Sequence, residues 1–443
     1  MKQLVFMTTA TLVGTAGVFA YSPSYGVFVY YLFAVLRPQY IWEWSLPPGI
    51  SWSFYVAIAT ILGAFLIGPS PAGAQRIAAK AHRLVSSHYV LLVFACWIAV
   101  TYCTARNTQA AYIWFEEYLK IFVMYAVSAF IIRTVNQVWA LFVMVGVVLA
   151  YISYEVNYHY FINHYLGMFH NGYCGLDNNG AGLMLAMGVP LCWFSYEGFQ
   201  KWWRWAFVVP IPLIVHAVLM TYSRGAMLSL LLMCPALVLR SRHRIRLGIV
   251  LGLFAFFAIP LMAGPEIRNR FFSIEAHEVD GSANSRRDSW AAGWGMAKDN
   301  PIFGVGVRNA NLYSLQYGAD VYGRTIHSQY LQIAADNGLV GLALYMGVLG
   351  SAWMSLGRCR RFVCGRTDFE ANLISSIARG LECSMLVFFI GAFFLSLEVF
   401  ELPYLLLLLA AQLEAVSKAA EPDGVIYQEA ATTDMAFPAS AAT

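Results

Sequence analysis

The second half of the chain contains four side chains suited to phosphate binding and proton transfer: Arg224, Arg286, Arg287 and His327. A planar guanidinium can donate two parallel hydrogen bonds to phosphate oxygens, whereas a neutral imidazole can accept a proton near pH 7. Taken alone, each Arg is equally compatible with an interfacial or solvated cation whose stem snorkels, and the His with a packing role. Their neighbours and positions in the chain must therefore decide between these interpretations.

His327 is expected at the beginning of a helix. Thr325 is a good N-cap residue, and the stretch 326–336 has helical character that Asn337-Gly338 should end. This places the imidazole in the first helical turn, where the positive end of the helix dipole and the neighbouring arginines favour its neutral form. A neutral ring at pH 7 can act as a base.

Other motifs in or near the same polar stretch carry weaker signals. Pro301-Ile302-Phe303-Gly304-Val305-Gly306 lacks the Gly-Lys-Ser/Thr ending of a nucleotide-binding loop, so we interpret it as a tight turn. Trp290 and Trp294 are four residues apart, a spacing that suits sugar stacking and a membrane-interface helix equally.

Arg106 and Lys120, much earlier in the chain, are expected near the outer face of the membrane and are secondary candidates for phosphate contact.

Residue types exclude several kinds of active site. The chain has no His-Glu-x-x-His, no Gly-x-Ser-x-Gly and no Asp-x-Asp near the polar stretch. The eight Cys residues lack the spacing of a zinc site or a disulfide framework. Carboxylates of the polar stretch are scattered without ligand-like spacing, at Asp280, Asp288, Asp299 and Asp320. A reaction without metal or cofactor is therefore expected.

The elements that position these residues are expected to be membrane helices. Hydrophobic residues make up 59% of the 443 residues and charged residues 12%, which leaves too little polar surface for a water-soluble globule. Continuous apolar runs near 20 residues indicate helices that cross a hydrocarbon core of roughly 30 Å. Residues 4–36 should form one long or two short elements, broken near Ser22-Pro23-Ser24. The other crossings are expected at 50–68, 89–104, 112–132, 138–154, 181–196, 205–221, 226–239, 247–263, 339–356, 381–397 and 399–413.

The orientation follows from Lys and Arg, which concentrate in short cytoplasmic loops. If the crossings alternate, four basic loops lie on one side: 76–83, 201–204, 240–246 and 358–366. We assign this side to the cytoplasm, which places 154–180 and 264–338 outside. An inside amino terminus requires 4–36 to cross once and gives twelve crossings, whereas an outside amino terminus gives thirteen.

The predicted fold class is an all-α integral membrane protein with about twelve transmembrane helices and one large, mainly helical outer loop between the ninth and tenth crossings. Residues 1–263 would form the amino-terminal membrane helices, 264–338 the outer loop and 339–416 the carboxy-terminal membrane helices. The tail 417–443, rich in Ala, Thr, Glu and Pro, is expected to be disordered in the cytoplasm. The sequence shows no convincing internal repeat, which a transporter built from inverted halves predicts.

The motifs of the outer loop, in their order and spacing, resemble those of the O-antigen ligase and polymerase family. They are Ser285-Arg286-Arg287-Asp288-Ser289-Trp290, the turn at 301–306, Ile326-His327-Ser328-Gln329-Tyr330, and Asp336-Asn337-Gly338-Leu339-Val340-Gly341. Upstream, Thr221-Tyr222-Ser223-Arg224-Gly225-Ala226 and Asp177-Asn178-Asn179 are similar to two earlier motifs of that family. The resemblance covers roughly residues 141–356 and departs at Ser328, where that family typically has Asn.

This resemblance implies a glycosyltransferase of the bacterial inner membrane that acts in lipopolysaccharide biosynthesis. It implies an undecaprenyl-pyrophosphate-linked glycan as donor and a lipid A-core hydroxyl as acceptor, on the periplasmic face. Arg224 and Arg286 would bind the donor pyrophosphate, with Arg287 as the alternative to Arg286, because only Arg286 lies four residues before Trp290. His327 would take the acceptor proton in one displacement that inverts the anomeric carbon.

Three alternatives remain open. Within the family, the chain could be an O-antigen polymerase or a protein O-oligosaccharyltransferase. Outside enzymes, it could be a lipid-linked glycan flippase or another transporter. Transport predicts ionisable residues deep in the membrane along a path, whereas the notable charges here gather at the outer face.

Overall fold

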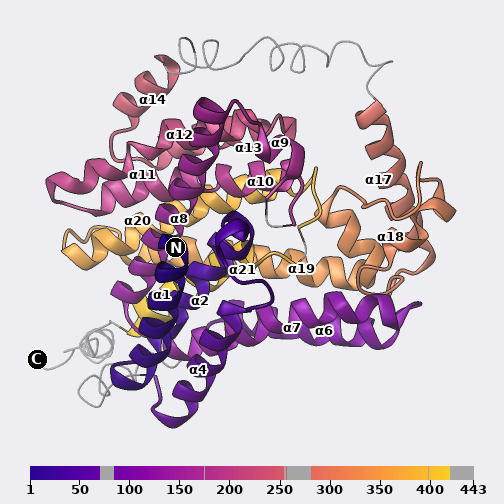
Figure 1. Cartoon of the computed structure of the whole chain (residues 1–443), viewed down its shortest axis with the longest axis horizontal. Helices are drawn as coiled ribbons and strands as arrows, with labels where there is room; N and C mark the ends of the chain where they lie inside the picture. Colours follow the sequence, from indigo (N-terminus) through magenta and orange to yellow (C-terminus); the bar gives the residue numbers. More distant parts are fainter. Residues whose placement is uncertain (70–83, 174, 254–255, 257–280, 398, 420–443) are drawn as a thin grey trace, which may run out of the picture.

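The computed structural model describes residues 1–69, 84–173, 175–253, 256, 281–397 and 399–419. The described residues are helical throughout, apart from loops and one isolated bridge between Tyr173 and Leu176 (Figure 1). Five features expected from the sequence lie wholly or partly outside the described residues: the basic loop 76–83, Cys174, the crossing 247–263, the outer-loop segment 264–280 with Asp280, and the tail from 420 onward.

The amino-terminal region forms two helices, as one of the two expected arrangements predicts. Helix α1 (Lys2–Ala20) and helix α2 (Ser24–Leu36) are separated at Pro23, whose ring cannot continue a helix ladder. The two helices pack against each other and against α4 (Trp52–Leu66). Beyond α2, Arg37 adopts a left-handed backbone and its guanidinium pairs with Glu401 at 2.6 Å.

The rest of the chain forms further helices, and most of the expected crossings coincide with one of them. In chain order they are α3 (Pro38–Ile41), η1 (Glu43–Ser45), α6 (Ser86–Cys103), α7 (Thr108–Ile131), α8 (Val135–Asn163), α9 (Gly167–Asn171), α10 (Asn178–Ala186), α11 (Gly188–Gly198), η2 (Trp202–Phe207), α12 (Pro210–Met220), α13 (Arg224–Arg240), α14 (Arg244–Leu253), α17 (Gly281–Asp299), α18 (Ala310–Tyr313), η5 (Ser314–Tyr317), α19 (Gln329–Phe362), α20 (Phe369–Gly391) and α21 (Glu401–Ala419). Within the described residues, seven segments are long and apolar enough to cross a membrane. The chain is therefore described as an integral membrane α-protein, and the number twelve stays a prediction.

One expected membrane helix ends earlier than the sequence indicates. The apolar run 381–397 is helical only to Gly391, and residues 392–397 form a loop. Gln329, the first residue of α19, forms hydrogen bonds with the backbone of this loop. Its backbone N–H donates to the Ala392 carbonyl at 2.8 Å, and its side-chain oxygen accepts from the Leu397 backbone N–H at 2.5 Å. Because these backbone groups are hydrogen-bonded, the apolar stretch can be non-helical without leaving them unpaired.

The segment 326–336 and its Asn-Gly ending behave differently from the expected isolated helix. Helix α19 is interrupted at Gly338 (φ 74°, ψ 176°) but continues at once as a second helical segment. The Pro301–Gly306 turn packs backbone to backbone against this interruption, since a Cβ at Gly338 would lie 2.0 Å from the Ile302 carbonyl oxygen. The amides of Val305 and Gly306 donate to the backbone carbonyls of residues 335 and 336 at 2.9 Å each. The motif is thus a tight turn, as predicted, and these two amides are not available to a phosphate.

A buried ion-pair cluster joins three helices at the opposite end of α13 from Arg224. Glu382 of α20, 1% exposed, pairs with Arg240 at the end of α13 and with Arg360 of α19, the latter over 2.7 Å. Two of the four basic loops expected on one side therefore meet here. In Figure 1, α17 and α18 lie on the right of the helix bundle and α14 lies on the left.

Candidate functional site

His327 lies just before α19 and not in its first turn, which corrects the expected position. The helix begins at Gln329 with Ser328 as its N-cap residue, and His327 has a left-handed backbone (φ 53°). The physical reason lies in Thr325, which was expected to cap the helix. Its hydroxyl instead contacts the imidazole Nε2 at 3.1 Å, so the chain turns once more before the helix starts. Thr325 thereby becomes the hydrogen-bonding neighbour of the His.

Backbone strain gathers around this residue. Among the described residues, five other than Gly have a positive φ, and three of them lie within the sequence motifs or two residues after one: Tyr222, Arg308 and His327, with φ between 53° and 54°. A left-handed backbone costs a residue with a Cβ roughly 1–2 kcal/mol. Such strain persists only where the surroundings impose it, and it is common at functional sites.

His327 lines a cavity of about 430 Å³. Two cations, Arg308 and Arg324, and one carboxylate, Asp177, line the same cavity, and the loop 395–397 closes it. A concave site with two guanidinium groups and an imidazole suits an anionic ligand.

The two cavity arginines were not predicted as site residues. Arg324 is spaced to pair with Asp320, and its Nε does so at 2.7 Å, which is the ordinary surface interpretation. Arg308 follows the glycine turn, and its guanidinium lies 4.4 Å from the centroid of the Trp114 ring. The only sequence signal for Arg308 is its position two residues after the Pro-x-x-Gly-x-Gly motif.

Helix α17 brings Arg286 and Trp290 to His327. The Trp290 indole Nε1 donates to the His327 carbonyl oxygen at 3.2 Å. Arg286 lies one turn earlier on the same helix and is half-buried, whereas Arg287 is exposed. The four-residue spacing that matched Arg286 to the family motif therefore also places it on the Trp290 side of the helix.

The electrostatic environment of His327 favours its neutral form. Burial is the largest cause that lowers its pKa, followed by the positive charge of Arg286, while Asp177 acts in the opposite direction. The expected direction is confirmed, but the main cause is burial and not the helix dipole. A base with a lowered pKa remains unprotonated at pH 7.

Arg224 is the first residue of α13 and is half-buried. It does not line the His327 cavity, but contacts connect its segment to the cavity. The Asn178 side chain donates to the Thr221 carbonyl at 2.9 Å, which joins the two upstream motifs. Phe394 contacts both α13 and α17. A Cβ added at Gly225 of α13 would lie 3.2 Å from the Cβ of Phe394, and the Phe394 ring centroid lies 6.3 Å from the ring centroid of Trp290 in α17.

The secondary candidates contact other protein groups. Arg106 donates to the Asn300 side chain at 3.0 Å. Lys120 forms ion pairs with Glu116 and Glu117 at 2.9 Å each. Neither cation lines the His327 cavity. Arg106 thus links the start of α7 to the residue before the turn, whereas Lys120 forms ion pairs only within its own helix.

A comparison with known families agrees with the motifs. Residues 211–346 match the family model described as O-antigen ligase. The matched segment contains all four residues singled out in the sequence, and the expected resemblance is confirmed over this segment. No curated protein matches the chain.

Proposed function

The chain carries an O-antigen ligase domain, and from this premise we propose that it moves a glycan from undecaprenyl pyrophosphate to a lipid A-core hydroxyl. The observation that carries the proposal is the environment of His327, which favours the neutral imidazole and places it in a cavity with two guanidinium groups. Trp290 donates a hydrogen bond to the backbone of this His and lies one turn from Arg286 on α17. A base next to several cations matches a reaction in which a hydroxyl attacks and a pyrophosphate leaves.

The donor pyrophosphate would be held by Arg224 and Arg286. Both are half-buried, Arg224 at the beginning of α13 and Arg286 on α17. Planar forks bind phosphate oxygens in pairs, and their charge stabilises the negative charge that develops on the leaving group. Arg287, which is exposed, is assigned no direct contact.

The acceptor hydroxyl would lose its proton to His327. As the acceptor oxygen bonds to the anomeric carbon, the bond from that carbon to the pyrophosphate oxygen breaks and the carrier pyrophosphate leaves. A single displacement of this kind inverts the anomeric configuration. The contact between Thr325 and Nε2 orients the imidazole. The activated diphosphate drives the transfer, so ATP is not required, and the arginines would supply positive charge in place of a metal.

The proposed site faces the periplasm. In this orientation the inner membrane holds the helix bundle, the ion-pair cluster around Glu382 lies on the cytoplasmic side, and α17 with α18 lies outside. The support comes from the basic residues at one end of α13 and the donor-binding Arg224 at the other.

The deciding experiment uses purified protein in proteoliposomes with carrier-linked glycan and lipid A-core. The expected result is transfer by the native protein and a loss on the order of 10²- to 10⁴-fold for His327→Ala, with donor binding retained. Native protein that ignores lipid A-core but lengthens carrier-linked glycan would identify a polymerase. Translocation of donor without any transfer would identify a flippase and overturn the proposal.

A further inference from the structure

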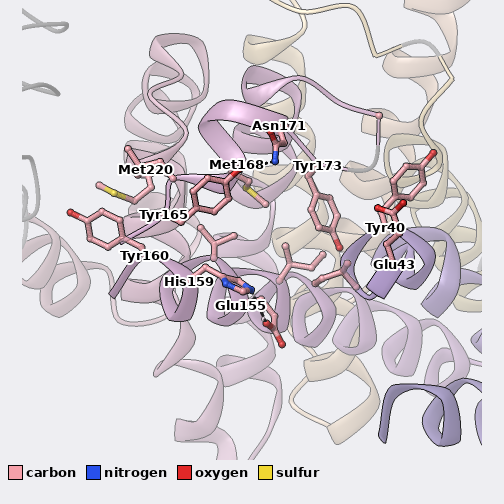
Figure 2. Close-up of a pocket in the computed structure, with 17 residues that line it drawn as sticks. Tyr40, Glu43, Glu155, His159, Tyr160, Tyr165, Met168, Asn171, Tyr173 and Met220 are labelled. Atoms are coloured by element: carbon pink, nitrogen blue, oxygen red, sulfur yellow. Dashed lines mark hydrogen bonds and ion pairs between the residues drawn. The ribbon is translucent and has the colours of Figure 1, made fainter. Parts of the chain in front are cut away.

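A second cavity, also of about 430 Å³, lies beside the His327 cavity and has the opposite character. Figure 2 shows it between the carboxy-terminal part of α8, the short helix α9 and the α3–η1 segment. Tyrosine rings line it, together with the carboxylates of Glu43 and Glu155, and no Lys or Arg from the described part of the chain contributes. An acidic, aromatic wall disfavours phosphate, which the cationic cavity favours.

The polar groups of this second cavity are held in place by hydrogen bonds. The Glu155 carboxylate accepts a bond from the Tyr151 hydroxyl, and one of its oxygens lies 3.9 Å from Nε2 of His159. Opposite, the Asn171 amide nitrogen donates to the Tyr165 hydroxyl at 2.9 Å. Figure 2 shows His159 beside Glu155 and Asn171 with Tyr165. Fixed acceptors and an oriented phenol suit a ligand rich in hydroxyl groups.

A single tight turn separates the two cavities. Tyr173 and Leu176 exchange two backbone hydrogen bonds of 2.9 Å each, and Gly175 between them lines both cavities. Asp177, next in the chain, lines only the His327 cavity. The two cavities are therefore neighbours, separated by the width of this turn.

The position along α8 also fits a ligand that lies outside the hydrocarbon. A helix of 29 residues is about 44 Å long, well beyond a hydrocarbon core of roughly 30 Å. Its last third carries Glu155 and His159 among tyrosines, a composition typical of the membrane–water interface. Aliphatic side chains such as Ile152 and Met220 also line the cavity, but an isoprenoid chain placed there would bring apolar carbon against the Glu43 and Glu155 carboxylates, which costs free energy.

We propose that the cavity around Glu155 and Tyr165 is a saccharide subsite for one of the two glycans that meet at His327. The inference rests on the proposed function and adds a location at which the sugar rings are recognised. Tyrosine faces would stack on the rings, and the Glu43 and Glu155 carboxylates would accept hydrogen bonds from hydroxyls. The donor glycan and the acceptor core share this chemistry, so the test has one arm for each.

The test measures binding of two probes to the purified full chain in detergent, by a titration that does not depend on transfer. One probe is the oligosaccharide released by mild acid from the cells' carrier-linked glycan, and the other is the core oligosaccharide released by mild acid from their lipopolysaccharide. Glu155→Gln and Tyr165→Ala should each raise the Kd for one probe roughly tenfold. The matched control is Tyr158→Ala. Tyr158 lies on α8 with Glu155 but does not line the cavity, so this variant should bind both probes as the native chain does.

Each outcome decides the proposal. The proposal is overturned if native chain and both variants have equal Kd values for both probes. It is also overturned if the variants bind undecaprenol more weakly but bind both sugar probes as the native chain does. Two independent variants guard against one that misfolds. If the variants weaken sugar binding but the native chain never transfers glycan, the subsite stands and the proposed function fails. If transfer occurs and the variants bind both probes normally, only the subsite fails.

Discussion

The indole N–H of Trp290 donates a hydrogen bond to the backbone carbonyl of His327 across 3.2 Å, and it thereby links α17 to the strained residue before α19. Trp290→Phe keeps an aromatic ring, although a smaller one, and removes the N–H donor. Since one neutral hydrogen bond contributes about 1 kcal/mol, we expect kcat to fall roughly fivefold while the KM for donor stays unchanged. Trp294→Phe, one turn further on and 45% exposed, is the control. A changed KM with native kcat would show that Trp290 contacts donor and does not position His327.

The pH dependence of transfer should report the lowered pKa of His327. The base is lost as pH falls through that pKa, so the acidic midpoint of kcat/KM should lie below the ordinary value of about 6.5. Arg286→Gln removes a positive charge that lowers the pKa, and the midpoint should move upward. Arg287→Gln, with the same charge change on an exposed side chain, should leave it in place. A profile without an acidic limb would remove His327 as the base.

The two adjacent arginines provide a matched pair for pyrophosphate binding. Arg286→Ala and Arg224→Ala should each lower kcat/KM about 10- to 100-fold, because each removes charge-assisted hydrogen bonds. Lys at either position should restore little, since a point charge cannot replace a planar fork. Arg287→Ala should be mild. An essential Arg287 beside a dispensable Arg286 would contradict both the spacing argument and the position of Arg286 on the Trp290 side of α17.

Metal removal should not affect transfer. The guanidinium groups supply the positive charge that a divalent ion supplies at many pyrophosphate sites, so EDTA-treated enzyme should retain its native rate. The measurement is the initial rate before and after chelation. Activity that disappears with EDTA and returns with Mg²⁺ would refute the metal-independent mechanism.

The topology can be tested with one engineered and one natural cysteine. Lys298→Cys lies on the exposed surface of α17, and Cys364 is an exposed cysteine in the loop after α19. With all other cysteines, including Cys174, replaced by Ser, an impermeant maleimide should label residue 298 in intact cells and Cys364 only after permeabilisation. The reverse pattern would invert the protein and place the site in the cytoplasm.

Hydropathy and motif order predicted much of this arrangement from the sequence. Long apolar runs need no tertiary context, so most helices lie where they were expected, and the Trp290 spacing predicted which Arg shares its side of α17. The loop 392–397 was assigned to a membrane helix, because its composition is apolar and only the contacts of Gln329 show why it can be irregular. Distant partners of this kind leave no local signal.

The strained and cationic parts of the site were harder to predict. His327 was placed inside the helix because Thr325 is a typical N-cap residue, and nothing local shows that its hydroxyl binds the imidazole instead. Arg308 and Arg324 resemble ordinary loop cations until the fold brings them to one cavity. Strain at Arg308 and His327 departs from local preference, as functional residues often do.

The buried Glu382 binds together the far ends of the elements that build the site. Through Arg240 and Arg360 it ties α13 and α19 to α20, and the other ends of these helices present Arg224, the approach to His327 and the loop 392–397. Moving one helix sideways would take an arginine away from the buried Glu382 carboxylate, which costs free energy because a buried charge is stable only when it is paired. The three helices are thus fixed relative to one another before a substrate binds, so substrate binding free energy is not needed to order the protein. We therefore expect the proposed transfer to select its two glycans by their fit to the site and not by closure of the protein around them.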